Sequence, residues 1–309
     1  MTNATRHILV VAHAHRTETV EAARRVLDAL LGAGARPVLA ADDREELGAV
    51  LGHLDEVATL GADVGADELE LAIVLGGDGT ILRAAELVRD GAAPILGINM
   101  GHIGFLAEIE RDDMDDAVRR VIARDYTVEE RMTLSVQVED VSDEVVFETW
   151  ALNEATVEKA SRERMLEVVV EVDERPLSTF GCDGVVVATP TGSTAYNFSA
   201  GGPVVWPTVE AIAVVPLSAH ALFARALVLA PESTVAIEVL TRTTTAGILW
   251  CDGRRSHDLP PGARVIVRRS PEPVRLARLH PAVFTDRLVR KFRLPVEGWR
   301  GPAHGAGMA

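Results

Sequence analysis

The chain has 309 residues, 48% of them hydrophobic, with 46 acidic against 31 basic side chains and a formal net charge of −15 at pH 7. This charge argues against nucleic-acid partners and anionic membrane surfaces, because both require a positive face. No apolar run approaches the roughly 20 residues of a membrane helix, so we expect a cytoplasmic protein with no membrane partner. The length predicts two domains, and two cysteines are too few for a disulfide framework.

The first part of the chain alternates predicted strands and helices, as an open parallel sheet does. An apolar run at residues 8–12 predicts a buried strand, and helical spacing of apolar residues over 17–31 predicts its covering helix. Further strands are predicted at 37–40, 71–75 and 94–98, and further helices at 81–90 and 110–123. The pattern predicts a Rossmann-like α/β nucleotide-binding domain over residues 1–125.

After residue 125 the pattern changes to strands without intervening helices. The predicted strands cover residues 133–138, 145–152, 166–172, 184–188, 211–215, 227–229, 234–240, 246–249 and 264–268. They predict an all-β, sandwich-like domain over residues 126–280. Residues 281–309 are predicted to form a tail that returns to the first domain, with a disordered Gly/Ala-rich end at 301–309.

The motif GGDGT at residues 76–80 lies between a predicted buried strand and a helix, where ligands collect in open α/β sheets. Its glycines let the backbone approach a phosphate, and the helix that follows aims unpaired N–H groups at the anion. The chain has no lysine loop of the Walker type, so backbone amides, arginine or a metal must hold any phosphate. A tight turn in which Asp78 only caps the helix is the alternative.

Asp78 itself indicates a reaction rather than binding alone. A carboxylate among phosphate-binding amides repels the ligand, but it can accept a hydroxyl proton during phosphoryl transfer. Arg83, in the first turns after the motif, can reach back toward phosphate or can be a solvated helix residue.

Two motifs in the second part of the chain carry polar groups suited to a nucleotide. Asn153-Glu154 ends a predicted strand, where an amide and a carboxylate can bind a ribose diol or an adenine edge, although such a pair is also common on surfaces. TPTGSTAYNFSAGGP at residues 189–203 concentrates hydroxyls and glycines around the flat ring of Tyr196; a Ser/Thr/Gly linker is the alternative. The basic residues of 287–293 are interpreted as one face of an amphipathic helix.

GGDGT, Asn153-Glu154 and the 189–203 element occur in an order and spacing that resemble the NAD kinases. Residues 97–106 are similar to the same family, and the resemblance covers about residues 71–225 well. The superfamily also contains diacylglycerol kinases and 6-phosphofructokinases. GGDGT is shared with lipid kinases, whereas the TPTGSTAY element is close to diagnostic.

The resemblance implies transfer of a phosphoryl group from ATP, or from polyphosphate, to the 2′-hydroxyl of the adenosine ribose of NAD, with Asp78 as general base. The phosphate-binding residues that it implies are Gly76, Gly77, Gly79 and Thr80. The NAD-binding residues that it implies are Asp78, Gly79, Arg83, Asn153, Glu154, Arg164, Asp183, Thr194, Ala195, Tyr196, Asn197, Phe198 and Ser199. It also implies Mg²⁺ carried by the donor, a homodimer or homotetramer, and a site in the crevice between the two domains.

Two departures from the family and two other functions stay open at this point. Gly181 stands where some bacterial relatives carry arginine, and Ala226 follows Arg225 where proline is more usual. A lipid kinase would use the same GGDGT motif, although the acidic chain shows no basic interfacial helix. A nucleotide-sensing protein would keep the pocket without turnover.

Overall fold

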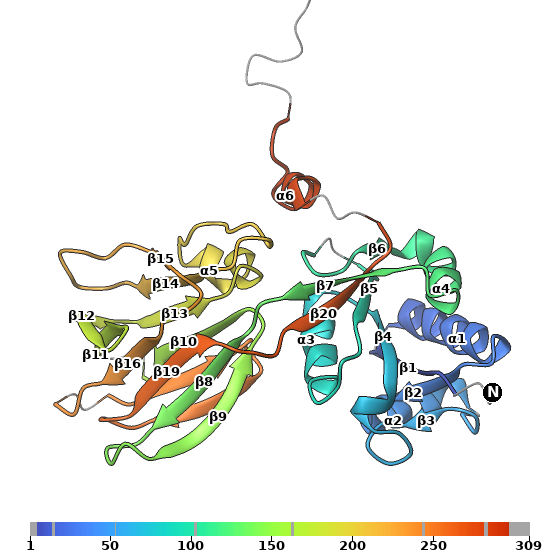
Figure 1. Ribbon diagram of the computed structural model, residues 1–309, viewed down its shortest axis with the longest axis horizontal. Coiled ribbons are helices and arrows are strands. Elements are labelled where there is room, and N and C mark those ends of the chain that lie inside the picture. The colour runs from blue at the N-terminus through green and yellow to red at the C-terminus, as the bar shows by residue number, and fades with distance from the viewer. Residues whose placement is uncertain are drawn as a thin grey trace, which may run out of the picture. The chain divides into compact units, whose positions relative to one another are not determined.

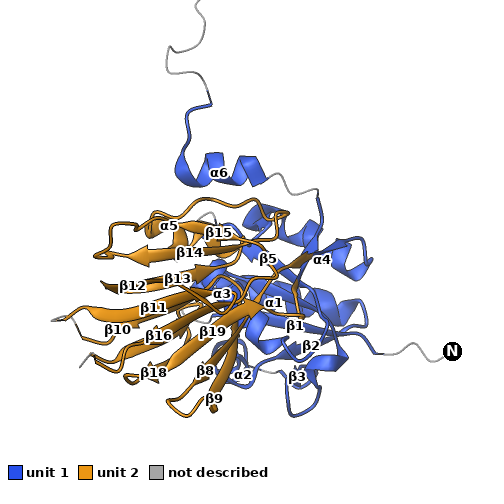
Figure 2. Cartoon of the chain, turned by 60° about the vertical axis from the view of Figure 1, so that its left-hand side comes forward, with its two compact units in different colours: residues 1–129, 275–309 blue, residues 130–274 orange. Residues whose placement is uncertain are grey.

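The computed structural model describes residues 5–13, 16–52, 54–101, 104–161, 164–242, 245–280 and 284–296. The chain divides into two compact units, coloured separately in Figure 2. The first unit combines residues 1–129 with 275–309, and the second comprises residues 130–274.

An eight-stranded sheet forms the centre of the first unit (Figure 1). Its strands in spatial order are β3 (Ala58–Thr59), β2 (Arg36–Leu39), β1 (His7–Ala12), β4 (Leu69–Leu75), β5 (Ile95–Asn99), β20 (Val274–Arg278) and β7 (Thr127–Arg131), and β6 (Ile109–Glu110) also pairs with β5. The pairings among β1 to β6 and between β20 and β5 are parallel. The order β3-β2-β1-β4-β5 is that of a Rossmann fold, which confirms the predicted α/β class.

Helices cover both faces of this sheet. They are α1 (Thr17–Gly32), α2 (Ala41–Leu51), α3 (Asp78–Leu87) and α4 (Met114–Ile122), with short 3₁₀ turns η1 (Ala66–Glu68) and η2 (Arg111–Asp113). Helix α6 (Phe284–Phe292) also belongs to this unit and has no buried residue. In Figure 1, α1 and α4 lie on one side of the sheet and α3 lies on the other. Helix α2 escaped prediction because only Asp43 and Leu47 of its residues are buried, so it has no apolar stripe.

The second unit is a sandwich of two six-stranded antiparallel sheets. One sheet has the order β15 (Leu227–Leu229), β14 (Ile212–Leu217), β13 (Gly184–Ala188), β10 (Glu154–Lys159), β17 (Gly247–Cys251) and β18 (Arg255–Leu259). The other has the order β12 (Arg175–Cys182), β11 (Leu166–Val172), β16 (Val235–Val239), β19 (Arg264–Arg269), β8 (Leu134–Glu139) and β9 (Val145–Ala151). One core joins them, since Val157 and Leu249 of the first sheet pack in the same cluster as Val168 and Ile237 of the second. The predicted all-β, sandwich-like class is therefore confirmed.

The boundaries between the units differ from the predicted 1–125, 126–280 and 281–309. Strands β7 and β20 belong to the sheet of the first unit, although both fall in the predicted β domain. Their sequences alternate as those of other strands do, so the local pattern does not reveal which sheet they join. Helix α6 is placed with the first unit, and residues 297–309 lie outside the described part of the chain. Within the described residues, no helix has the length and apolar character needed to span a membrane.

Candidate active site

The polar residues of the first unit gather at the point where the strand order reverses. Strands β1 and β4 pair with Ala12 opposite Leu75, so His13 and Gly76 directly follow neighbouring strand ends. Parallel α/β sheets bind ligands at such a switch point, beyond the carboxyl ends of the strands. A cavity of about 530 Å³ lies there, lined by the GGDGT loop, the ends of β1 and β5, the start of α1 and Lys291 of α6.

The GGDGT loop is shaped by close packing at one glycine and open space at two others. A Cβ on Gly76 would lie 2.3 Å from Oγ1 of Thr80, so no other residue fits while the threonine folds over the loop. A Cβ on Gly77 or Gly79 would meet no atom within 4 Å. Gly76, Gly77 and Thr80 line the cavity with Asp78, while Gly79 is not among its lining residues. The loop thus leaves open backbone beside the cavity, as a phosphate site requires.

Asp78 is held from the side by a segment that follows β5. Its Oδ2 accepts a hydrogen bond from the backbone N–H of Phe105 at 2.9 Å, and its Oδ1 accepts one from Leu106 at 3.0 Å. Helix α3 begins at Asp78 with Gly77 as its N-cap, without a side-chain cap. Asp78 therefore does not act as a simple helix cap, and each carboxylate oxygen keeps a lone pair for another donor.

The side chain of Arg83 binds Asp43 and does not line the GGDGT cavity. Its Nη1 donates to Oδ1 of Asp43 on α2 at 2.6 Å, and the Asp43 side chain is only 2% exposed. Burial raises the pKa of Asp43, while the Arg83 hydrogen bond and charge oppose this shift. Arg83 does not line the cavity, so its predicted contact with NAD stays a prediction.

The Asn153-Glu154 motif is fixed by a buried carboxylate that the sequence did not single out. Oxygens of Asp252 accept hydrogen bonds from the backbone N–H groups of Leu152, Asn153 and Glu154 at 2.9, 2.6 and 3.3 Å. Arg255 donates to the same carboxylate at 2.7 Å. The one feature of the sequence that could have drawn attention to Asp252 was the predicted Asp252-Gly253 turn, in which Asp252 adopts a positive φ of 54°.

Glu154 faces a hollow of about 330 Å³, shared with Thr156, Glu158, Tyr196 and Trp250. Burial raises the pKa of Glu154 to about 8, with the nearby Asp252 carboxylate adding to the rise and a backbone hydrogen bond from Tyr196 opposing it. A carboxyl group that keeps its proton near neutral pH can both donate to and accept from a ribose hydroxyl.

The 189–203 element is packed onto the Asn153-Glu154 turn. Thr189 donates from Oγ1 to the carbonyl of Leu152 at 2.6 Å and from its backbone N–H to Asn153 at 2.9 Å. A Cβ on Gly192 would lie 2.0 Å from the carbonyl oxygen of Asn153, so the two segments touch through backbone. The element therefore positions the turn, and a loose linker is excluded.

The predicted NAD-binding residues of this element divide by exposure across η3 (Gly192–Thr194) and α5 (Tyr196–Ser199). Asn197 is fully buried, and its Nδ2 donates to the carbonyls of Ser193 and Pro203 at 3.3 and 3.1 Å. Tyr196, Phe198 and Ser199 are exposed, and Thr194 and Ala195 are half-buried. The exposed and half-buried side chains are available to a ligand, whereas Asn197 holds the loop together.

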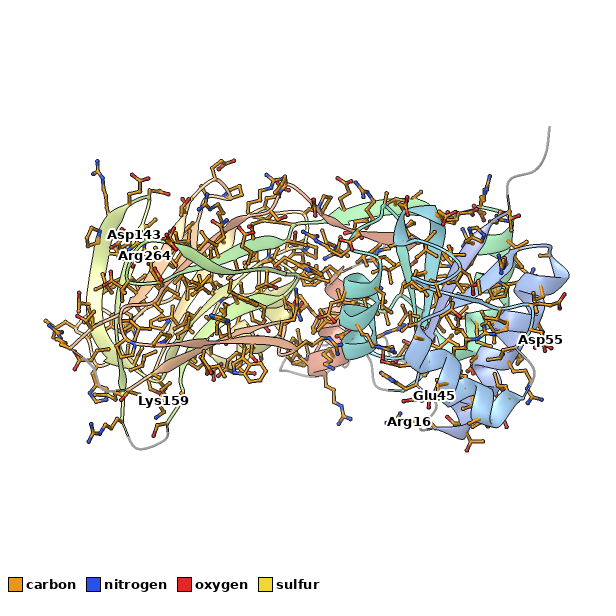
Figure 3. All side chains as sticks on the ribbon, turned by 90° about the horizontal axis from the view of Figure 1, so that it is seen from below. Arg16, Glu45, Asp55, Asp143, Lys159 and Arg264 are labelled. Atoms are coloured by element: carbon orange, nitrogen blue, oxygen red, sulfur yellow. The ribbon has the colours of Figure 1, made fainter. Side chains whose placement is uncertain are left out.

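Asp183 is not among the residues that line this hollow, and it lies beside Lys159 at the end of β10 opposite to Glu154. Oδ1 of Asp183 forms an ion pair with Nζ of Lys159, 2.5 Å away. Hydrogen bonds from Lys159 and Ser218 lower the pKa of Asp183. Lys159 stands at the end of β10 (Figure 3). Burial raises the pKa of Tyr196, and the charges of Glu158, Glu154 and Asp183 raise it further, which places these acids around the phenol. Arg164 instead lines a separate hollow, with Gly181 and Arg242.

Comparisons with known proteins identify the family of the chain. Residues 8–126 match the model of the ATP-NAD kinase N-terminal domain, and residues 152–279 match that of the ATP-NAD kinase C-terminal domain. The NAD kinase of Leifsonia xyli is 66% identical, with 97% of this chain and 98% of the relative covered. The NAD kinase of Thermobifida fusca is 58% identical over 96% of this chain and 92% of its own.

The chain belongs to the NAD kinase family.

Two solved structures place its fold in the same family. An NAD kinase from Archaeoglobus fulgidus, solved in complex with ATP, superposes with a TM-score of 0.70 at 25% identity, with 94% of this chain and 99% of that chain covered. The yeast NADH kinase, complexed with NADH, gives a TM-score of 0.86 over 96% of this chain and 89% of its own. Its 21% identity supports the fold alone. None of these relatives supports the lipid-kinase alternative.

Gly181, which stands where some NAD kinases carry arginine, lies close to Met165 and His220. A Cβ there would lie 3.1 Å from the terminal methyl of Met165, and the backbone of Gly181 bonds to His220. The site also contains two cations that the sequence analysis did not assign to it, since Arg16 at the start of α1 and Lys291 of α6 line the GGDGT cavity. Lys291 was interpreted as part of a helix face, since nothing local connects it to residues 76–80.

Proposed function

We propose that the chain phosphorylates the 2′-hydroxyl of the adenosine ribose of NAD, with ATP as donor, to give NADP. The observation that carries the proposal is the carboxylate of Asp78, fixed by two backbone amides at a cavity whose lining includes glycine backbone and the basic side chains of Arg16 and Lys291. Such a cavity suits phosphates, while a fixed carboxylate inside it suits proton removal from an attacking hydroxyl.

The dinucleotide is assigned to the second unit. Glu154 and Asn153 would bind ribose hydroxyls, with Tyr196 as a flat surface for a base. Asp183 lies beside Lys159 at the other end of β10, so it would contact another part of the dinucleotide. Two relatives support both ligand classes, since the yeast NADH kinase was solved with NADH and the Archaeoglobus fulgidus NAD kinase with ATP.

Catalysis in this proposal depends on proton removal and charge neutralisation. Asp78 takes the proton of the 2′-hydroxyl as the hydroxyl oxygen attacks the terminal phosphorus of ATP, and the bond from that phosphorus to the bridging oxygen breaks to release ADP. Backbone N–H groups at the start of α3 would hold the phosphates. Within the described residues, no three His, Cys, Asp or Glu side chains gather as a protein-held metal would need. Mg²⁺ would enter the site bound to the phosphates of ATP, where it would neutralise their charge.

The test is NADP formation from NAD, ATP and Mg²⁺, followed with an NADP-specific dehydrogenase. Asp78→Asn keeps the size of the side chain but cannot accept the proton, so we expect turnover to fall by about 10²-fold or more. Asp90→Asn, an exposed position beyond the end of α3, is the matched control. Calorimetry should show that Asp78→Asn still binds NAD and ATP.

A loss of less than about tenfold in Asp78→Asn would overturn the assignment of the base. Replacing ATP with polyphosphate in the same assay tests the other donor. A wild-type protein that binds NAD yet makes no NADP with either donor would identify a nucleotide-sensing protein instead.

The homo-oligomer expected from the resemblance is also a proposal. Large apolar side chains are exposed at and before the edge strand β15, namely Leu222, Phe223 and Val228, and such a patch is commonly an interface. Size-exclusion chromatography with light scattering would measure the mass of the protein in solution and distinguish a monomer from a dimer or tetramer. The cytoplasmic location stays a prediction that cell fractionation can test.

A further inference from the structure

Helix α6 reaches the GGDGT cavity although it lies outside both matched family regions, which end at residue 279. We propose that Lys291 of this helix binds the phosphates of the phosphoryl donor, so that the C-terminal helix completes the donor site. This inference rests on the proposed function and adds a residue to its donor site.

Three residues of α6 contact Phe105. Nη1 of Arg287 donates to the carbonyl of Phe105 at 2.6 Å. The rings of Phe284 and Phe292 lie 6.0 and 5.8 Å from the ring of Phe105, centroid to centroid. Aromatic contacts at such distances, together with a partly buried hydrogen bond, hold the helix on this segment.

The same residue holds the catalytic carboxylate. The backbone N–H of Phe105 donates to Asp78, while its carbonyl accepts from Arg287, so α6 and Asp78 are attached to the two sides of one peptide segment. Lys291 lies four residues after Arg287, on the same face of the helix. This face brings the lysine to the lining of the cavity that contains Asp78.

The charges of the cavity differ from those of the whole chain. The protein carries a formal charge of −15, yet the described residues that line the cavity include Lys291 and Arg16 against one carboxylate, that of Asp78. Arg16 extends over Gly101, where a Cβ would lie 3.3 Å from its Nη1. A local basic lining in an acidic protein concentrates anionic ligands, and a lysine on its flexible stem is a common phosphate ligand.

The experiment compares Lys291→Met with Arg290→Met, which removes an exposed cation from the same helix but not from the cavity. Calorimetry would measure the Kd of each variant for Mg-ATP and for inorganic tripolyphosphate. We expect Lys291→Met to weaken both ligands by about tenfold, the usual scale for one charge-assisted hydrogen bond at a partly exposed site. Arg290→Met should bind both as the wild type does, and Lys291→Arg should recover most of the loss.

Steady-state kinetics provide the second readout. Lys291→Met should raise the KM for ATP by a similar factor, with the KM for NAD unchanged, and thermal unfolding should show that the variant is folded. Equal donor affinity in Lys291→Met and Arg290→Met would overturn the inference. Weaker binding of ATP with unchanged binding of tripolyphosphate would also overturn the inference, because the lysine would then contact the nucleoside. A wild type that binds ATP but forms no NADP would refute the proposed function while leaving the lysine contact measurable.

Discussion

Oδ2 of Asp78 accepts a hydrogen bond from the backbone of Phe105, 27 residues along the chain. The glycine before this phenylalanine allows the approach, since a Cβ on Gly104 would lie 2.2 Å from Oδ1 of Asp78. The direction in which the carboxylate points is therefore determined by backbone from another loop. The rate of proton removal depends on that direction, because general-base catalysis requires hydrogen-bond geometry with the hydroxyl.

Gly104→Ala should impair turnover without removing any functional group. The new methyl must displace the Asp78 carboxylate, and a shift of about 1 Å in a catalytic group can lower the rate by about 10²-fold. We expect kcat to fall at least about tenfold while the Kd for NAD stays close to that of the wild type. Gly32→Ala, where a Cβ meets no atom within 4 Å, is the control. Unchanged kcat in Gly104→Ala would show that the carboxylate position does not matter.

Glu154→Gln should change how stability depends on pH. The pKa of Glu154 is raised from its ordinary value of 4.5 to about 8 in the folded protein. Between these values the unfolded chain has lost the proton that the folded chain keeps, so stability falls as pH rises through this window and levels off above it. A glutamine is neutral at every pH in this range. We therefore expect the free energy of unfolding of the variant to rise relative to that of the wild type between pH 5 and pH 8, by on the order of a few kcal/mol.

Thermal unfolding of both proteins at several pH values would measure this gain. The exposed Glu232, changed to glutamine in the same unit, should show no such trend. A constant difference in Tm between wild type and Glu154→Gln across the window would mean that Glu154 titrates normally.

Asp252→Ala should destabilise the second unit and weaken NAD binding together. The change leaves three backbone N–H groups and the guanidinium of Arg255 without their shared acceptor. Removing one partner of a buried ion pair costs about 3–5 kcal/mol, and we expect a loss of this size in urea unfolding. Asp258→Ala, at an exposed position on β18, should cost little. If the KM for NAD did not rise in Asp252→Ala, the support of the Asn153-Glu154 turn would be irrelevant to binding.

The parts of this enzyme that could be predicted are those that depend on local sequence. The run at 71–75 followed by GGDGT identified a strand, a loop and a helix start, and the structure places Asp78 at the end of β4 as that order requires. The hydroxyl-rich stretch at 189–203 was recognised by composition, and it packs against Asn153. Buried strands and glycine-rich turns leave such signals because their physical requirements are short-range.

The parts that escaped prediction depend on contacts distant in sequence. Asp252 supports Asn153 across 99 residues, and its own neighbours indicate only a turn. Strands β7 and β20 join the first sheet although they flank the second unit, because pairing partners are chosen by the fold and not by the strand's own pattern. Lys291 looks like a solvated helix residue until the contacts of Arg287 and Phe105 place its helix.

The pairing of Arg83 with Asp43 separates a structural role for this arginine from a role in binding. Arg83→Met leaves the buried Asp43 carboxylate without its ion pair, so we expect a loss of about 3–5 kcal/mol in the free energy of unfolding. Adding Asp43→Asn removes the stranded charge, and the double variant should be more stable than Arg83→Met alone. If the arginine acts only through this pair, the KM for NAD should recover along with stability. If the arginine also contacts the nucleotide, as the family resemblance implies, the double variant should regain stability, but its KM for NAD should stay as high as that of Arg83→Met.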